Sequence, residues 1–553
     1  MYATKLDSRV THSFTNTFIF MLPFRFLPSS RSFWAGAFLI AAGEVVLGAP
    51  YEHVLFLTID GLHAADIEDP ALAADIQNIS SLRKIGITFT NAFMPVPTDS
   101  FCGLLSHFTG ANPRTTGIYY DHAYSRTLYP HGSTPAAFPG SSLDSNGEID
   151  WDNALLGGGD ATRATSGAAG AASINPAKLQ MRKLDGKMVP VFPHELLNVN
   201  TIFEVAHAAG LRTAYIDKHP ACEIVNGPSG AGVDDFYAPE SDAKVKMEGT
   251  GGEARLVDAM TATTGPKGLG KISKSIPLSN AYDDVRLAAL LHQIDGKTSI
   301  GADVPGDAVP ALFGMNFVAL GNAQRLPDGG IDAERGPSAA LRLALSHIDA
   351  SVGRVVSELR SRGLFDKTLI VLTAKHGNSP RVGAARVLPP GTFTIALANA
   401  RIQVAAVEQD DSVLLWLKDP TQARIAKEAL VTAPGVDTVL AGGAELAAAG
   451  FGDPAKDDRT PDIIIKLNAG YLVSDSPKRA EHGGFSDDDT HVALVLASGA
   501  LPPALAGSVQ GETVSTNQIA VTALQALGLD VGKLQGAVAE KTPALPGTGI
   551  IVK

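Results

Sequence analysis

The fold is decided by the stretch Val54-Leu-Phe-Leu-Thr-Ile59, which is followed directly by Asp60 and Gly61. A short apolar run that ends in an Asp-Gly pair is typical of a strand buried on both faces of a parallel sheet. In such a sheet, the side chains just past the carboxyl ends of the strands gather in one crevice. Asp60 is therefore placed to hold a cation or a polar ligand, although an Asp-Gly pair also ends strands in simple turns.

Further apolar runs alternate with amphipathic stretches along the chain. This alternation is typical of an α/β protein in which helices join buried parallel strands. The sequence predicts an α/β fold with a mostly parallel central sheet flanked by helices. We expect a long helix from Ser338 to Arg362, and later strands at residues 212–216, 311–315, 368–373 and 492–497.

Two regions interrupt the alternation. Residues 127–192 are rich in Gly, Ser, Ala and Asp, which predicts a long excursion from the core. Residues 381–480 contain strand and helix patterns of their own and are interpreted as an inserted, smaller cap-like subdomain. Residues 50–380 and 481–553 then form the core.

Residues 1–49 are interpreted as a signal peptide or leader. Arg25 and Arg31 precede an apolar stretch that begins at Phe33, and small residues follow at Gly48 and Ala49. We expect a cleaved signal peptide and a secreted or extracytoplasmic protein. An uncleaved signal anchor is the alternative.

Composition narrows the class of protein. The chain has 553 residues, of which 45% are hydrophobic, so it can bury a large core and is not a disordered chain. Its formal net charge of −12 disfavours a nucleic-acid scaffold, which needs concentrated positive charge. A small phosphorylated substrate remains compatible, because a metal or a helix N-terminus can meet its charge locally.

Three further segments carry residues suited to phosphoryl chemistry. A helix is expected to begin near Ser100, where unpaired N–H groups can hold a phosphoryl group, although the serine can also serve as a simple helix cap. His376 follows the strand at 368–373, and His482 precedes the one at 492–497. Together with Asp60, these histidines form a set that metal ligation would explain.

On these residues, the sequence resembles the alkaline phosphatase superfamily and, within it, the type I phosphodiesterase/nucleotide pyrophosphatase family. The resemblance runs from about His53 to Pro503. Ser100 lies in Pro97-Thr-Asp-Ser-Phe101, ten residues before Gly110 of a Thr-Gly pair, as in the nucleophile motif of that family. The Cys/Ser-x-Pro-x-Arg motif of the sulfatase branch does not match at this position.

The resemblance implies an alkaline-phosphatase-like core and a catalytic set. Ser100 would be the nucleophile, Asp60 and His376 would bind one metal together with it, and His482 would bind the other. The implied cofactor is one or two divalent metal ions, and the histidine and aspartate ligands favour zinc.

Three positions depart from the pattern of the family. Lys375 stands where the family has an aspartate, while Asn316 and Leu320 align with an aspartate and a histidine. Lys375 is a candidate catalytic residue, because an ammonium near Ser100 could stand in for a divalent cation. Alternatively, it turns outward to solvent.

Four residues are candidates for auxiliary or substrate-binding roles. Asp217 and His219 follow the strand expected at 212–216, so they are candidate replacement ligands, or else part of a solvated turn. Asn316 and Asn322 are candidates for the orientation of substrate oxygens.

The sequence predicts a secreted, metal-dependent hydrolase of phosphodiester or nucleotide pyrophosphate bonds that forms a covalent phosphoryl- or nucleotidyl-serine. One alternative is a catalytically weak or inactive relative that binds a phosphorylated or sulfated ligand. Another is an enzyme that transfers or isomerises a phosphoryl group. The expected partner is a small phosphorylated substrate, without nucleic-acid scaffold binding and without a stable membrane span after cleavage of the signal. The oligomeric state is not indicated.

Overall fold

The computed structural model describes residues 51–137, 148–150, 174–241, 244–249, 255–257 and 267–550. The leader prediction for residues 1–49 lies outside these ranges, as does the middle of the Gly-rich excursion. Within the described ranges, no helix combines the length and apolar character needed to cross a membrane.

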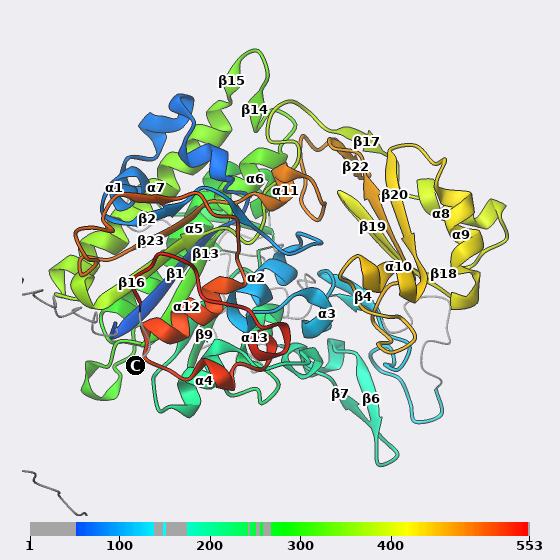
Figure 1. Cartoon of the computed structure of the whole chain (residues 1–553), viewed down its shortest axis with the longest axis horizontal. Coiled ribbons are helices and arrows are strands. Elements are labelled where there is room, and N and C mark those ends of the chain that lie inside the picture. Colours follow the sequence, from blue (N-terminus) through cyan, green and yellow to red (C-terminus); the bar gives the residue numbers. More distant parts are fainter. Residues whose placement is uncertain are drawn as a thin grey trace, which may run out of the picture. The chain divides into compact units, whose positions relative to one another are not determined.

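The core contains an eight-stranded sheet in the order β24-β2-β23-β16-β1-β13-β8-β9 (Figure 1). Strands β16, β1, β13, β8 and β9 run parallel to one another, whereas β23 is antiparallel to both β16 and β2. The mostly parallel sheet predicted from the sequence is therefore confirmed. Its strands are β1 His53–Ile59, β2 Ile87–Phe89, β8 Ala214–Ile216, β9 Asp235–Tyr237, β13 Leu312–Phe317, β16 Thr368–Thr373, β23 Leu494–Ala497 and β24 Ser508–Gln510.

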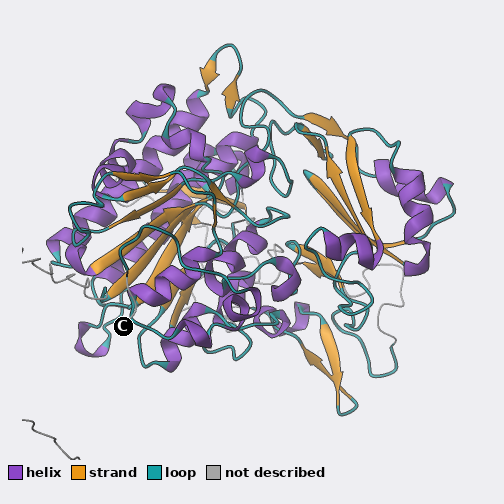
Figure 2. Cartoon of the chain, viewed as in Figure 1, coloured by secondary structure: helices purple, strands orange, loops and turns teal. Residues whose placement is uncertain are grey.

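Helices cover both faces of this sheet (Figure 2), which explains why the central strand β1 is buried along its whole length. The core has two large buried apolar clusters, and alternate residues of β1 belong to different ones. Val54 and Phe56 belong to the first, and Leu55 and Leu57 belong to the second. The first cluster includes residues of α2 Ser100–Thr109, α4 Ile202–Ala208 and α12 Gln518–Ala526. The second includes residues of α1 Gln77–Ile85, α5 Ile276–Ile294, α6 Ala319–Arg325 and α7 Ala339–Ser361.

Residues 381–480 contain a second sheet, of four strands in the order β18-β19-β21-β20. A separate apolar cluster, which includes Phe393 and Leu415, packs between this sheet and its helices. The elements are β18 Val404–Gln409, β19 Ser412–Leu417, β20 Val436–Ala441, β21 Ile463–Leu467, α8 Thr392–Asn399, α9 Ala423–Leu430 and α10 Gly442–Ala448. A strand pair, β17 Arg386–Leu388 with β22 Tyr471–Val473, lies near the two ends of this region.

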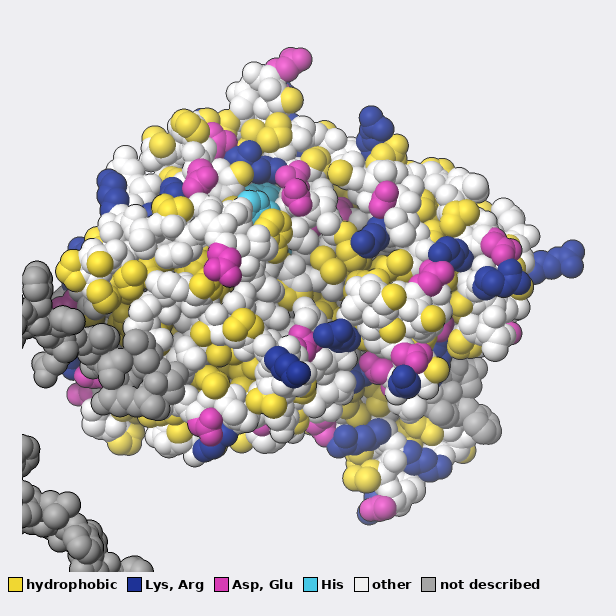
Figure 3. All heavy atoms as spheres, viewed as in Figure 1, with side chains coloured by type: hydrophobic (Ala, Val, Ile, Leu, Met, Phe, Trp, Pro, Cys, Tyr) yellow, Lys and Arg dark blue, Asp and Glu magenta, His cyan; other side chains and the backbone are white. Residues whose placement is uncertain are grey.

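Smaller elements complete the described chain. The Gly-rich excursion includes the hairpin of β6 Met181–Leu184 and β7 Lys187–Pro190, and β5 Glu148–Asp150, which pairs with β4 His122–Tyr124. The others are β3 Ala92–Phe93, β10 Lys244–Glu248, β11 Arg255–Val257, β12 Gly270–Lys271, β14 Ile331–Asp332, β15 Gly336–Pro337, β25 Val514–Ser515, α3 Pro113–Thr116, α11 Asp487–Thr490 and α13 Gln535–Glu540. On the face drawn in Figure 3, acidic and basic side chains are interspersed.

Candidate active site

Four neighbouring strands of the core sheet end in charged or polar side chains. Asp60 follows β1, Lys375 lies just past β16, Asn316 lies near the end of β13, and Asp217 and Lys218 follow β8. These strands are parallel neighbours, so their carboxyl ends lie at one edge of the sheet. All five side chains are buried there.

Helix α2 brings Ser100 to the same edge. Asp99 caps the helix by accepting a hydrogen bond from the N–H of Phe101 at 2.7 Å, so Ser100 is the first helical residue and is not the cap. Gly103 lets the helix approach the end of β16 closely, because a Cβ there would lie 1.9 Å from the carbonyl oxygen of Lys375. The missing side chain at this position therefore helps to place Ser100 at the strand ends.

The hydroxyl of Ser100 lies between a histidine and a lysine. Its Oγ is 3.2 Å from Nε2 of His376 and 2.8 Å from Nζ of Lys218. Nδ1 of His376 lies 2.9 Å from the carbonyl oxygen of Gly377, which can only accept, so Nδ1 carries the hydrogen and the lone pair of Nε2 faces Ser100. The hydroxyl thus accepts from Lys218 and donates to His376.

Burial keeps this histidine neutral. It lowers the pKa of His376 to about 4; the charge of Asp60 opposes the shift, and that of Lys218 adds to it. A neutral imidazole whose lone pair faces a hydroxyl can accept its proton.

Asp60 receives hydrogen bonds from two sides. Its Oδ2 accepts from Nζ of Lys218 at 2.9 Å and from Nδ2 of Asn316 at 3.3 Å. Its Oδ1 lies 3.8 Å from Nε2 of His376 and, among the described residues, has no hydrogen-bond partner. Burial by itself raises the pKa of Asp60, but Lys218, His376 and Lys375 together outweigh this effect and lower the pKa overall, so the group is a carboxylate.

Lys375 has a different partner from the one expected. Its Nζ lies 2.8 Å from each carboxylate oxygen of Asp217, and both side chains are fully buried. The lysine therefore does not turn outward to solvent. The ammonium that contacts Ser100 belongs to Lys218, a residue that was not predicted although it lies between Asp217 and His219 in the sequence.

His482 lies beside the same group. Its ring centroid is 4.1 Å from that of His376, and burial lowers its pKa well below the usual range. The preceding residue, Glu481, forms an ion pair with Arg325 at 3.0 Å and another with Lys478. The sequence prediction that Asp60, Ser100, His376 and His482 gather in one place thus agrees with their positions.

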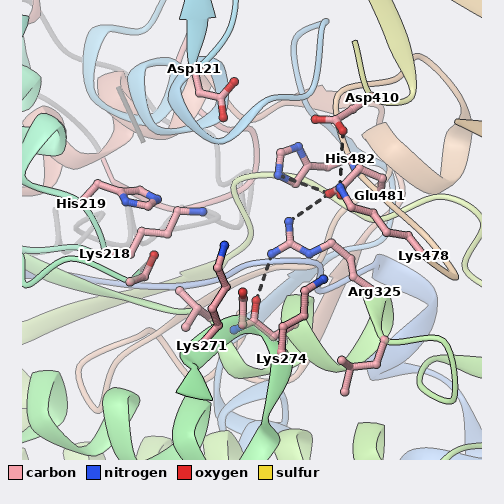
Figure 4. A pocket seen from close by; sticks show the side chains of 15 residues that line it. Asp121, Lys218, His219, Lys271, Lys274, Arg325, Asp410, Lys478, Glu481 and His482 are labelled. Carbon is pink, nitrogen blue, oxygen red and sulfur yellow. Dashed lines mark hydrogen bonds and ion pairs between the residues drawn. The ribbon is translucent and has the colours of Figure 1, made fainter. Parts of the chain in front are cut away.

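A cavity of about 270 Å³ opens beside this group and is lined by Lys218 and His482, among others (Figure 4). Charged side chains dominate its wall. Five are basic, namely Lys218, Lys271, Lys274, Arg325 and Lys478, and three are acidic, namely Asp121, Asp410 and Glu481. Burial and the neighbouring charges of Lys478 and Arg325 lower the pKa of Lys274, which indicates that positive charge accumulates here.

Two of the predicted auxiliary residues line this cavity. His219 does so while its Nδ1 lies 2.8 Å from Oε1 of Glu240. Asn322 donates a hydrogen bond from Nδ2 to Oγ of Ser279 at 3.0 Å and accepts one from Arg325 at 3.0 Å. The basic residues of the wall were not predicted, since a single lysine or arginine in a sequence carries no signal that it faces a cavity.

The buried residues do not fit a pair of zinc ions. The resemblance assigns Asp60 and Ser100 to one metal, yet the ammonium of Lys218 already bonds to both. At the position of the second metal, the chain has the amide of Asn316 and the apolar side chain of Leu320, which is buried in an apolar cluster. Zinc requires histidine, cysteine or carboxylate ligands, which these two residues do not supply.

Another group in the described ranges has the ligand types that a metal requires. Donor atoms of Asp121, His122 and Glu408 lie within 4.8 Å of one another, and all three residues are half-buried. His122 Nδ1 is 3.1 Å from a carboxylate oxygen of Glu408 and 3.6 Å from one of Asp121. This triad joins β4 and the loop before it to β18.

A helix that places a serine over the carboxyl ends of a mostly parallel sheet, near a basic cavity, is the arrangement expected of an alkaline-phosphatase-like core. The family model of type I phosphodiesterase / nucleotide pyrophosphatase matches residues 54–489, and the chain belongs to this family. It is therefore a hydrolase of this kind.

Solved structures with the same fold include murine ectonucleotide pyrophosphatase/phosphodiesterase 5, at 12% identity and a TM-score of 0.54. An inactive variant of the murine protein in complex with AMP gives a TM-score of 0.55, and the human protein gives 0.52, both also at 12% identity. Each alignment covers 86% of this chain and 95% of the other. No curated protein sequence matches the chain. At this identity, the likeness concerns the fold alone.

Proposed function

We propose that the protein hydrolyses a phosphodiester or pyrophosphate bond with Ser100 as its nucleophile. The observation that carries this proposal is the position of the Ser100 hydroxyl between His376 and Lys218, of which Lys218 lines a basic cavity. Oγ would attack phosphorus while its proton passes to Nε2 of His376. The bond to the leaving oxygen breaks, and the phosphoryl- or nucleotidyl-serine is then hydrolysed by water.

The charges of the cavity favour a substrate with more than one anionic group. Lys271, Lys274, Arg325 and Lys478 line the cavity in addition to Lys218. Arg325 and Lys478 already pair with Glu481, so Lys271 and Lys274 would meet a second phosphate next to the one at Ser100, as in a nucleoside di- or triphosphate. The AMP complex of the murine relative is consistent with a nucleotide substrate here.

The predicted zinc has no part in the proposed step, because the residues around Ser100 do not fit it. The triad of Asp121, His122 and Glu408 has ligand types that suit zinc and is where we place a divalent ion, if the chain holds one.

Export is also part of the proposal. It is supported by the leader pattern at residues 1–49 and by the word ectonucleotide in the names of the similar structures.

The nucleophile is tested by turnover of an aryl phosphodiester and of a nucleoside triphosphate by purified wild type, Ser100→Ala and Ser106→Ala. Ser106 is a matched control, because it lies on the same helix and its Oγ donates to the carbonyl of Gly103. We expect Ser100→Ala to lose at least about 10³-fold in kcat, as removal of a nucleophile does, and Ser106→Ala to retain activity.

Equal turnover by wild type and Ser100→Ala would refute the nucleophile. A wild type that turns over no phosphoric ester, yet binds nucleotides or sulfated ligands in the cavity, would instead support the inactive relative. Formation of a phosphorylated product without release of phosphate or alcohol would support transfer or isomerisation.

A further inference from the structure

We infer that the hydrolysis proceeds without a divalent metal at Ser100, because the ammonium of Lys218 takes the place of the ion. This inference rests on the proposed function, whose nucleophile it shares. It assigns to Lys218 a catalytic role that the motif of the family does not contain.

The first argument is the position of the ammonium. Nζ of Lys218 lies 2.9 Å from Oδ2 of Asp60 and 2.8 Å from Oγ of Ser100, so it bridges a carboxylate and the attacking hydroxyl. A zinc ion that bridged the same two oxygens would lie about 2.0–2.2 Å from each of them. The ammonium and such an ion would occupy overlapping space and repel each other, so the site holds one or the other.

The second argument is that the neighbouring groups are already satisfied. Asn316 donates from Nδ2 to Asp60, and its Oδ1 accepts from Oγ1 of Thr58 at 2.8 Å, so both ends of the amide are used. Lys375 lies between both oxygens of Asp217. The two polar departures from the pattern of the family, Asn316 and Lys375, therefore each have their own partner in this chain.

The third argument is the balance of charge. Two buried carboxylates, Asp60 and Asp217, face two buried ammonium groups, Lys218 and Lys375. The positive charge that a metal would supply at the strand ends is thus supplied by the chain itself. An added divalent ion would leave an uncompensated buried charge, which is unfavourable.

The geometry also provides a chemical role for Lys218. Its ammonium donates to Oγ of Ser100 and favours the negative charge that develops there as the proton leaves for His376. Asp60 holds the ammonium in place from the other side. No proton leaves Lys218 in this step, so it acts as a fixed cation and hydrogen-bond donor.

The test compares wild type with Lys218→Met, which keeps a side chain of similar length and removes the charge. Lys456→Met is the matched control, because this lysine is 83% exposed and lies outside the site. Each protein is dialysed against a chelator, its metal content is measured by mass spectrometry, and turnover of an aryl phosphodiester is followed with chelator or with added zinc.

We expect the metal-free wild type to keep its rate within about twofold, and Lys218→Met to lose at least about 10²-fold, the size of effect typical for loss of one group that stabilises charge in the transition state. Loss of wild-type activity on chelation, restored by zinc and abolished by Ser100→Ala, would overturn this inference but keep the proposed function. A wild type that is inactive with and without zinc would overturn both.

A binding measurement keeps the inference testable if Lys218→Met fails to fold. Zinc is titrated against a chromogenic chelator into Glu408→Gln, which disables the separate triad. We expect no tight zinc binding by this variant. Stoichiometric zinc binding that is lost in Glu408→Gln/His376→Ala would show that the strand ends hold the metal and would overturn the inference.

Discussion

Lys375→Met tests whether Lys375 is chiefly the structural partner of Asp217. Nζ lies 2.8 Å from both oxygens of that carboxylate, and each side chain is 0% exposed. Methionine has a similar length and no charge, so the substitution removes the ion pair with little change in volume. Asp217 would then keep the hydrogen bond from the backbone N–H of Lys218, at 2.8 Å, but would lose its cation.

The size of the effect follows from this burial. Removal of one partner from a buried ion pair costs about 3–5 kcal/mol, because the other charge is left uncompensated. An unfolding entropy of about 2.1 cal/mol/K per residue amounts to roughly 1 kcal/mol per degree for 553 residues. The melting temperature of Lys375→Met should therefore fall by about 3–5 °C in calorimetry, with a matching fall of the urea midpoint.

The control is the double variant Lys375→Met/Asp217→Asn, which removes both charges. It should recover at least about half of the lost stability, since residues in direct contact couple strongly. A single variant within about 0.5 kcal/mol of wild type would refute the reasoning, because surface changes alone have effects of that size. Strict additivity of the two substitutions would refute it equally.

Three further predictions concern pH, packing and substrate binding. Asp66, 2.8 Å from His63, raises the pKa of this buried histidine against the effect of burial, so His63→Gln should destabilise the protein more at pH 6 than at pH 9, as measured by urea unfolding. The stabilisation is complete below the ordinary pKa of 6.5 and is lost as pH rises through the raised value; a pH-independent difference would contradict it. Gly103→Ala should cost about 1–3 kcal/mol and lower kcat, because its methyl group would meet the carbonyl oxygen of Lys375, and wild-type values for both would exclude this contact. Lys271→Met should raise KM for a nucleoside triphosphate about tenfold, the effect of one charged hydrogen bond, and leave KM for an aryl diester nearly unchanged. Equal changes for both substrates would contradict a second phosphate subsite.

The core strands were predictable because burial on both faces makes each one a continuous apolar run. The strand predicted at residues 368–373 matches β16 at both ends, and the helix expected from Ser338 is α7, with Ser338 as its cap. Direction was harder to predict. The run at 492–497 was expected to join a mostly parallel sheet, but β23 runs antiparallel, because an apolar run looks the same in both directions. Its first residue, Val492, bridges to His63 outside the strand.

The candidate site was predictable where one residue at each strand end decides the chemistry. Asp60 and His376 could be placed together because parallel strands bring their carboxyl ends to one edge. His482 precedes β23, and because β23 runs antiparallel to β16, the start of β23 lies at the same edge. Lys218 could not be predicted in this way. It follows Asp217 directly, and the sequence does not show which of two consecutive side chains faces the crevice and which faces the neighbouring strand.

The pairing of the two lysines explains why the sequence, read one position at a time, suggested Lys375 as the cation beside Ser100, where the structure has Lys218. In the sheet order β16-β1-β13-β8, Lys375 reaches from the end of β16 to Asp217 at the end of β8, and Lys218 reaches from β8 to Asp60 at the end of β1. The two ion pairs cross the same edge, so the loss of either lysine leaves a buried carboxylate without its cation. An aspartate at position 375 would restore the residue of the family but would leave three carboxylates with one ammonium. Lys375 and Lys218 therefore form a coupled set, and a return to a metal site would require both to change together.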